Sequence, residues 1–340
     1  SNLVWPGIDS ISVCVRAAIF LAGLVLFGQG SKSLGTIVAI SSYASYFWQP
    51  IMNLGNIFNN FINNIAYLER IFETMDEPVT VKDAENAVKM PEIRGEVTFD
   101  HVNFSYDESK QILKDVSFTV KPGESVALVG PTGAGKSTIV NLISRFYNVN
   151  GGRVLIDGQD ISQVTIHSLR EQMGIMMQDS FIFSGDIEDN IRYGKLDATR
   201  EEIVNASKTV CADEFISKML DGYQTEVRER GSMLSQGQKQ LISFARTLLS
   251  DPAILILDEA TSSIDVQTEK ALQTGLNAML KGRTSFIIAH RLSTIRNCDK
   301  IMYIDNGGIM ESGTHDELMA KKGYYYKLYT AQLDEVQKAG

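Results

Sequence analysis

The stretch that decides the fold is Gly130-Pro131-Thr132-Gly133-Ala134-Gly135-Lys136-Ser137-Thr138. It follows the apolar residues 126–129 and opens a helical pattern, so we expect a strand, a loop and a helix in turn. Glycines let a backbone wrap closely around phosphate oxygens, and the N–H groups at the start of the helix favour negative charge. We expect Lys136 to reach the β- and γ-phosphates and Ser137 to place its hydroxyl on Mg²⁺. The alternative is a glycine-rich turn before an amphipathic helix, whose apolar positions are Ile139, Leu142, Ile143 and Phe146.

A second apolar run ends in two carboxylates. Residues 253–257 are continuously apolar, which is typical of a strand buried on both faces of a parallel sheet, and Asp258 and Glu259 follow them. We expect Asp258 to hold Mg²⁺, directly or through water, and Glu259 to polarise the attacking water. Two adjacent carboxylates can equally mark a strand end that meets solvent.

Two further strand-like runs end in a chemically capable side chain. Residues 174–177 lead into Gln178, and residues 285–289 lead into His290. Ligands of open α/β sheets bind outside the carboxyl ends of the strands, so we expect both side chains to converge on the phosphate loop. Their alternatives are a polar surface residue and a hydrogen-bonded structural histidine.

The amino-terminal part has the composition of a membrane segment. Its first 68 residues carry only three charged side chains, Asp9, Arg16 and Lys32. Residues 11–28 are apolar apart from Arg16 and, with their flanks, reach the ~20 residues that cross a bilayer. We therefore expect residues 1–75 to belong to a transmembrane domain, with two membrane helices at about 10–29 and 35–68 joined by a short turn.

Five asparagines gather on one face of the second expected helix. They step by three and four residues and are Asn53, Asn56, Asn60, Asn63 and Asn64. Polar side chains at membrane depth face a cavity or a bundle interior, so this face is a candidate pathway lining. A contact between helices, held by asparagine side chains, explains the pattern equally well.

The rest of the chain has the charge density of a soluble domain. We expect a linker at residues 76–91 and a nucleotide-binding domain at residues 92–340. The chain begins without Met, so we expect it to be the carboxyl-terminal part of a longer polytopic protein. The formal net charge of -9, without a cluster of Lys or Arg, excludes nucleic acid as a main partner.

One more run makes the nucleotide motifs specific: Leu234-Ser235-Gln236-Gly237-Gln238. It resembles the signature motif that the ATP-binding cassette (ABC) family adds to a phosphate loop and that other P-loop ATPases lack. The resemblance covers about residues 97–335. It implies an α/β P-loop NTPase domain, that is, an ABC ATPase with a helical subdomain, preceded here by transmembrane α-helices. It also implies ATP and Mg²⁺ as cofactors.

The resemblance assigns roles to single residues. The catalytic residues are the catalytic glutamate Glu259, the switch histidine His290 and the Q-loop glutamine Gln178. The Mg²⁺ ligands are Ser137, Gln178 and the Walker B aspartate Asp258. The nucleotide is bound by the loop at residues 130–138 and by Tyr106, Ser235, Gln236, Gly237, Gln238 and the D-loop aspartate Asp265. Tyr106 matches the aromatic that stacks on adenine, and its alternative is an ordinary core aromatic of a strand.

In this family the signature lies on the opposite subunit and caps the γ-phosphate of ATP. We therefore expect a second ABC half-transporter as partner, in a homodimer or a heterodimer. Ser235 and the Gly237 N–H, at the start of a helix expected over residues 238–249, suit such an anion. Gln236 and Arg228 depart from the family pattern, because glycine is common at both positions. Gln236 keeps its backbone donor unless the site requires φ > 0.

The membrane segment is similar to the last two helices of exporters whose membrane and nucleotide domains share one polypeptide. This resemblance implies that ATP hydrolysis drives export of a small molecule, lipid or peptide by alternating access. It also implies a multi-pass protein of the cell membrane, in contact with the lipid bilayer, whose nucleotide-binding domain is cytoplasmic. The alternatives are an ATP-gated channel or regulator, which often lacks the residue equivalent to Glu259 or His290, and a soluble ABC ATPase, which would not need residues 11–68.

Overall fold

The computed structural model describes residues 4–27, 31–107, 110–177, 180–258, 266–289 and 291–339. The chain divides into two compact units, Ser1–Val79 and Thr80–Gly340, and each is considered by itself.

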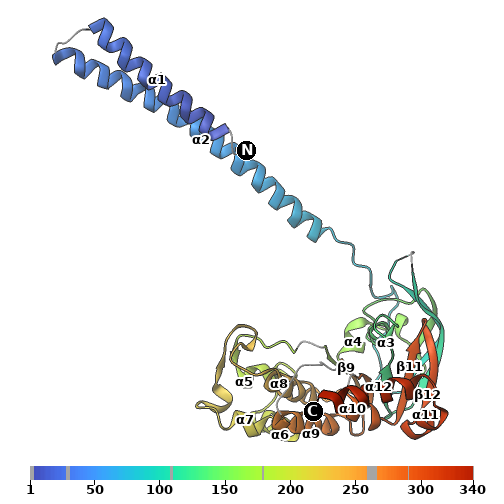
Figure 1. Ribbon diagram of the computed structural model, residues 1–340. Helices are drawn as coiled ribbons and strands as arrows, with labels where there is room; N and C mark the ends of the chain where they lie inside the picture. The colour runs from blue at the N-terminus through green and yellow to red at the C-terminus, as the bar shows by residue number, and fades with distance from the viewer. Residues whose placement is uncertain are drawn as a thin grey trace. The chain divides into compact units, whose positions relative to one another are not determined.

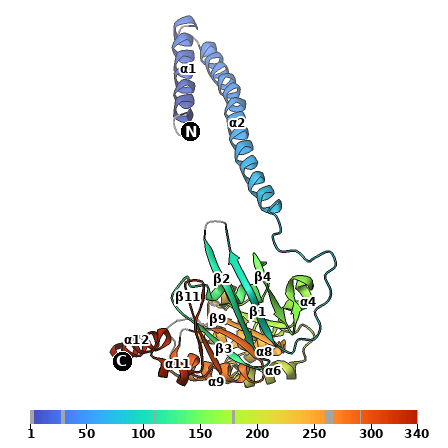
Figure 2. The same ribbon diagram turned by 90° about the vertical axis from the view of Figure 1, so that its right-hand side faces the viewer.

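The first unit is a hairpin of two long helices, α1 (Val4–Phe27) and α2 (Ser31–Met75), which run side by side in opposite directions (Figures 1 and 2). The helices approach closely at Gly23, where a Cβ would lie 2.6 Å from Cγ1 of Ile37, and Ile37 is buried there. Most other large apolar side chains of the unit are exposed, for example Val25 at 81%. Within the described residues, no helix of the protein combines the length and the apolar character that a membrane crossing requires. Both segments are helical in the structure, but each helix begins earlier than expected and α2 ends later; their membrane crossing stays a prediction.

The second unit is built on two larger sheets and one small one. A six-stranded sheet has the order β12-β11-β3-β10-β9-β6, a four-stranded antiparallel sheet has the order β2-β1-β4-β5, and β7 pairs with β8. The strands are β1 (Val97–Ser105), β2 (Gln111–Val120), β3 (Ser125–Val129), β4 (Gly151–Ile156), β5 (Gln159–Asp160), β6 (Met173–Met176), β7 (Gly185–Asp186), β8 (Glu226–Val227), β9 (Ile254–Asp258), β10 (Thr284–Ile288), β11 (Lys300–Asp305) and β12 (Gly308–Gly313).

The helices of this unit are mostly short. They are α3 (Lys136–Ile143), α4 (Ile166–Arg170), α5 (Ile187–Arg192), α6 (Arg200–Thr209), α7 (Asp213–Ile216), α8 (Gln236–Leu249), α9 (Val266–Leu280), α10 (Leu292–Arg296), α11 (His315–Lys321) and α12 (Tyr324–Ala339). Single 3₁₀ turns lie at Ile161–Gln163, Gly222–Gln224 and Glu229–Gly231.

The central strands of the six-stranded sheet are buried on both faces, because alternate side chains enter two different cores. In β3, Val126 and Leu128 pack with α3 and with the four-stranded sheet, whereas Ala127 and Val129 face the core that also holds side chains of α5, α6, α8 and α9. The strands β11, β3, β10, β9 and β6 are parallel, and β12 is antiparallel at the edge. The continuous apolar runs of the sequence follow from this double burial. All the parallel strands therefore end at one edge of the sheet.

Candidate functional site

The predicted phosphate loop lies between β3 and α3, as expected from its sequence. Gly130, Gly133 and Gly135 have φ of 141°, 80° and 107°, values that a side chain strongly disfavours. A Cβ at Gly130 would lie 2.1 Å from the carbonyl oxygen of Ile304 in β11, so the loop can leave the sheet only through a glycine. Gly135 is the N-cap of α3 and provides no side-chain cap, which leaves the first N–H groups of the helix available to an anion.

Lys136 closes this loop in the structure. Its Nζ donates hydrogen bonds to the carbonyl oxygens of Gly130 and Pro131, both at 2.9 Å. Burial lowers the pKa of Lys136, and the negative charge of Asp258 opposes that shift. Strands β3 and β9 both pair with β10, so Asp258 and the loop lie at the same edge of the sheet. The ammonium is held over the loop, where it would meet a bound phosphate.

Tyr106 lies beside the same helix. Its hydroxyl is 3.1 Å from Oγ1 of Thr138, and its ring makes edge contacts with Phe104 and Tyr147 at centroid distances of 4.8 Å and 4.9 Å. The ring follows the last residue of β1 and is 48% exposed, so it is not a buried core aromatic. An exposed aromatic face beside the phosphate loop is the geometry that base stacking needs. The adenine contact itself stays a prediction.

The strand runs predicted from sequence are strands, and their ends lie together. Asp258 is the last residue of β9 and pairs in register with Ile288 of β10. Met176, which ends β6, pairs with Leu257. The carboxyl ends of β6, β9, β10 and β3 thus lie along one edge of the sheet, and the convergence of their side chains on the phosphate stays a prediction. Glu259, Asp265, Gln178 and His290 lie outside the described residues, so their predicted roles stay predictions.

The donor set at this edge fits Mg²⁺. Asp258 offers a carboxylate at the end of β9, and Ser137 offers an exposed hydroxyl in the first turn of α3. Oxygen donors of this kind, few in number and completed by phosphate and water, are what Mg²⁺ prefers. Two of the three predicted ligands are therefore described and chemically suitable.

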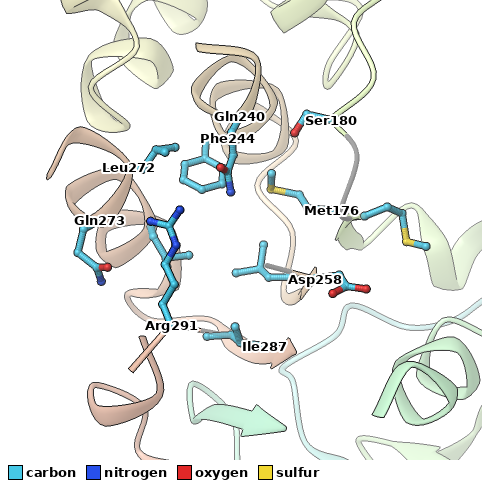
Figure 3. A pocket seen from close by; sticks show the side chains of 12 residues that line it. Met176, Ser180, Gln240, Phe244, Asp258, Leu272, Gln273, Ile287 and Arg291 are labelled. Atoms are coloured by element: carbon cyan, nitrogen blue, oxygen red, sulfur yellow. The ribbon is translucent and has the colours of Figure 1, made fainter. Parts of the chain in front are cut away.

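A small cavity of about 30 Å³ lies behind the strand ends, between α8 and α9 (Figure 3). Its wall is mostly apolar, with Phe244 of α8 and Leu272 of α9, and Asp258 and Arg291 lie on different sides of it. The residues that line it include none of the phosphate loop. Arg291 was not predicted from sequence; its Nη1 lies 3.3 Å from Oε1 of Glu269, and its only sequence signal is its position after His290.

The signature residues begin a helix, two residues earlier than expected. Ser235 is the N-cap of α8, and its Oγ accepts a hydrogen bond from the Gln238 N–H at 3.2 Å. In return, Oε1 of Gln238 accepts a hydrogen bond from the Ser235 N–H at 2.9 Å, which completes a capping box. Leu234 is buried and fixes this turn, while Ser235 is exposed. The predicted start at Gln238 is therefore wrong, because Gln238 is the third residue of the helix.

The two departures from the family pattern have ordinary backbones. Gln236 is the first residue of α8 and is not among the residues with positive φ. Arg228 has φ of -72° and ψ of 173°. Neither position requires a glycine, so the backbone donors expected at Gln236 and Gly237 are present.

Among the described residues, the hydrogen bonds of Ser235 join it to Gln238 and Lys239 of its own helix, and none joins it to residues 130–138. The structure thus brings together the loop, Tyr106 and Asp258, and it leaves the signature turn as a separate exposed feature.

Comparison with known proteins identifies these features. Residues 113–262 match the family model described as ABC transporter. The chain is 50% identical over 327 residues to the uncharacterized ABC transporter ATP-binding protein YknV of Bacillus subtilis (strain 168), covering 96% of this chain and 54% of that protein. It is 43% identical over 331 residues to the fatty acid ABC transporter ATP-binding/permease protein of Mycobacterium tuberculosis (strain CDC 1551 / Oshkosh), covering 97% and 52%.

A solved structure of a bacterial Atm1-family ABC exporter with ATP bound is similar to this chain, with a TM-score of 0.73 and 40% identity over 95% of this chain and 57% of that one. The chain belongs to the ABC transporter family, and its second unit has the P-loop NTPase fold of an ABC ATPase. It spans about half the length of the curated relatives it matches.

Proposed function

We propose that the whole protein is an exporter that uses ATP hydrolysis to move a small molecule, lipid or peptide outward across a membrane. The observation that carries this proposal is the phosphate loop with Lys136 folded over it, in the same unit as an exposed signature turn at Ser235. The relatives support the direction of transport, since they include a β-(1→2)glucan export ATP-binding/permease protein of Bradyrhizobium diazoefficiens. Relatives named as transporters favour this function over a channel or a soluble ATPase.

The chemistry would take place at the carboxyl ends of β3 and β9. Bound Mg²⁺ would neutralise charge on the phosphates, held by Ser137 and Asp258 together with Gln178. Lys136 would exchange its two carbonyl contacts for phosphate oxygens, because a charge-assisted bond to phosphate is stronger than a bond to a neutral carbonyl. Glu259 would orient and polarise the attacking water, with His290 beside it. Tyr106 would stack on the adenine.

The signature turn would complete the site of a partner subunit. Ser235, Gln236 and Gly237 begin α8, whose free N–H groups and positive dipole end favour a γ-phosphate. ATP would then hold two nucleotide-binding domains together, with Asp265 near the same interface. Loss of the γ-phosphate would remove these contacts and let the domains separate. The partner would be a second half-transporter, identical or different.

The first unit would supply part of the membrane domain. Its two helices expose large apolar side chains along their length, and α2 carries the asparagine face. Contiguous exposed apolar surface of this kind marks a contact with membrane or protein. The names of the relatives pair ATP binding with a permease, which supports a domain arrangement of residues 1–75, a linker at 76–91 and a nucleotide-binding domain at 92–340, with that domain in the cytoplasm.

Two substitutions test the proposed reaction. Lys136→Ala is expected to abolish ATP binding and turnover, because the loop loses its only cation within the motif. Glu259→Gln is expected to keep ATP binding and to slow hydrolysis by about 10²–10⁴-fold, which is the usual contribution of a positioned base. Equilibrium binding of ATP and phosphate release would be measured side by side. Substantial turnover by Lys136→Ala would refute the phosphate-loop assignment, and near-normal turnover by Glu259→Gln would reduce Glu259 to a structural role.

A further inference from the structure

A segment after α2 is bound at several points to the rest of the second unit. We define residues 82–93 as the strap. Val88 forms a parallel bridge with Val164: the Val88 N–H donates to the Gln163 carbonyl at 3.0 Å, and the Thr165 N–H donates to the Val88 carbonyl at 2.9 Å. Met90 and Ile93, farther along the strap, are buried. The strap is therefore part of the folded unit, and only residues 76–81 separate it from the end of α2.

Three more hydrogen bonds join the strap to α4 and to Gln172, which lies just beyond it. The Met90 N–H donates to Oγ of Ser168 at 2.8 Å, and the Ile93 N–H donates to Oε1 of Gln172 at 2.8 Å. Asp83 accepts a hydrogen bond from the Ile166 N–H at 2.8 Å. Gln172 immediately precedes β6, whose carboxyl end leads to Gln178. The strap is thus anchored to the same strand that is expected to carry the Q-loop.

Arg145 links the strap to the phosphate-binding helix. It follows Ser144, the C-cap of α3, and is 2% exposed. One Nη donates to the Val164 carbonyl at 2.5 Å and the other to the Lys82 carbonyl at 3.0 Å, while the Asp83 carboxylate lies 3.9 Å away. Helix α3 therefore has Lys136 at the end that faces the phosphate loop and Arg145 just past the end that faces the strap.

The backbone beneath Arg145 is fixed by a second arginine. Arg170 of α4 donates from Nε to the Ser144 carbonyl at 3.0 Å and from Nη2 to the Arg145 carbonyl at 2.8 Å. Because α4 also holds the strap through Ser168, the end of α3, α4 and the strap form one hydrogen-bonded unit. The planar guanidinium presents its N–H donors in a rigid fork, whereas a lysine ammonium is a point charge on a flexible stem.

We propose that Arg145 is a positioning residue that couples nucleotide binding at the phosphate loop to fixation of the strap. The proposal rests on the proposed function, since it needs ATP at the loop. The helix between the two sites is about 12 Å long and acts as a rigid element. A nucleotide that fixes the Lys136 end also fixes the Arg145 end, and with it the strap. By linkage, a loosened strap lowers nucleotide affinity by the same factor.

Amide hydrogen exchange on the full 340-residue chain in detergent tests the coupling. The probe is a slowly hydrolysed ATP analogue with Mg²⁺, and the readout is exchange at the Val88, Met90 and Ile93 amides. We expect the analogue to slow exchange in the strap by about fivefold or more, which is the low end of usual coupling between sites. In Arg145→Lys we expect the effect to fall below about twofold. Arg153→Lys is the matched control, because Arg153 pairs with Asp100 on the four-stranded sheet, and among the described residues no hydrogen bond joins its side chain to α3 or to the strap.

Each outcome bears on the proposal. Bound analogue without slower strap exchange in the wild-type chain would overturn it, as would an undiminished effect in Arg145→Lys. Failure to bind the analogue at all would overturn both this proposal and the proposed function. If Arg145→Lys does not fold, Ser168→Ala removes the Met90 acceptor and leaves α3 unchanged. Coupling then predicts weaker analogue affinity of the folded protein; a lower melting temperature with unchanged affinity would show a structural role only and overturn the proposal.

Discussion

Ser235 has one role in the structure and a second in the proposed function, and substitutions can separate the two. In the structure its Oγ caps α8 by accepting the Gln238 N–H, and its exposed position suits a partner's γ-phosphate. Ser235→Ala removes both the cap and the hydroxyl. Ser235→Asp keeps an acceptor for the Gln238 N–H but places a negative charge where the phosphate is expected. Stability and ATP-dependent association should therefore change in different directions.

The magnitudes follow from the cap and from the charge. Loss of a serine N-cap costs about 1 kcal/mol of unfolding free energy, which lowers the melting temperature of a large domain by about 2–4 °C. Aspartate caps equally well and adds about 0.3–1 kcal/mol through the helix dipole, so Ser235→Asp should be at least as stable as the wild type. A carboxylate about 4 Å from a phosphate costs about 1–4 kcal/mol at each site, so two sites weaken a dimer by more than about tenfold.

The assay uses residues 80–340 with Glu259→Gln in every variant, so that ATP is retained. Thermal unfolding gives stability, and the mass in solution with and without ATP and Mg²⁺ gives association. Thr314→Ala is the control, because it removes the same kind of capping box from α11, outside the signature motif. It should lose stability and keep the ATP-dependent dimer. An ATP-dependent dimer of Ser235→Asp as strong as that of the parent would refute phosphate recognition by the signature turn.

Two further predictions concern single contacts. Tyr106→Ala should weaken ATP binding by about 1–3 kcal/mol if the ring stacks on adenine, whereas Tyr106→Phe loses only the contact with Thr138 and should bind nearly normally in equilibrium titration. Equal losses in the two variants would contradict stacking. The pKa of Glu202 is lowered to about 2, first by its hydrogen bond to Lys195 and then by those to Thr199, so its carboxylate stabilises the fold above about pH 4.5 and loses this effect as the pH falls towards 2. Glu202→Gln removes this carboxylate, so the variant should unfold at lower urea concentration than the wild type above about pH 4.5. The difference in unfolding free energy should disappear as the pH falls towards 2. A difference that stays constant with pH would contradict the assignment.

The central sheet was predictable because its strands are buried twice. In β9 and β10 both alternate sets of side chains enter a core, so the sequence shows a continuous apolar run and not an alternating one. Such runs are easy to find, and the parallel order of the strands then places their ends at one edge. The position of Asp258 near the phosphate loop followed from this argument alone. Periodicity does not reveal the strand order, which depends on packing between distant segments.

The start of α8 was predictable in principle but was placed two residues late. Ser235 and Gln238 are spaced as a capping box requires, and this pattern marks the N-cap directly. Glycine at position 237 disfavours a helix by propensity and therefore obscures the signal. The cap geometry outweighs that propensity. This matters for the proposed function, because the true start makes Gln236 and Gly237 the first residues of α8, and their N–H groups are those that the proposed anion would meet.

Arg145 illustrates a contact that no local pattern could give. Its carbonyl partners are 19 and 63 residues away in the chain, and its φ of 51° is a conformation that arginine rarely adopts. The buried guanidinium is held by the Val164 and Lys82 carbonyls, so the end of α3 and the strap share these contacts. At the other end of the same helix, the Lys136 ammonium donates to two loop carbonyls, which the phosphate oxygens of a nucleotide would replace. Helix α3 joins the phosphate loop to Arg145. Binding of a nucleotide at the loop and a shift of the strap therefore both act on this one short helix.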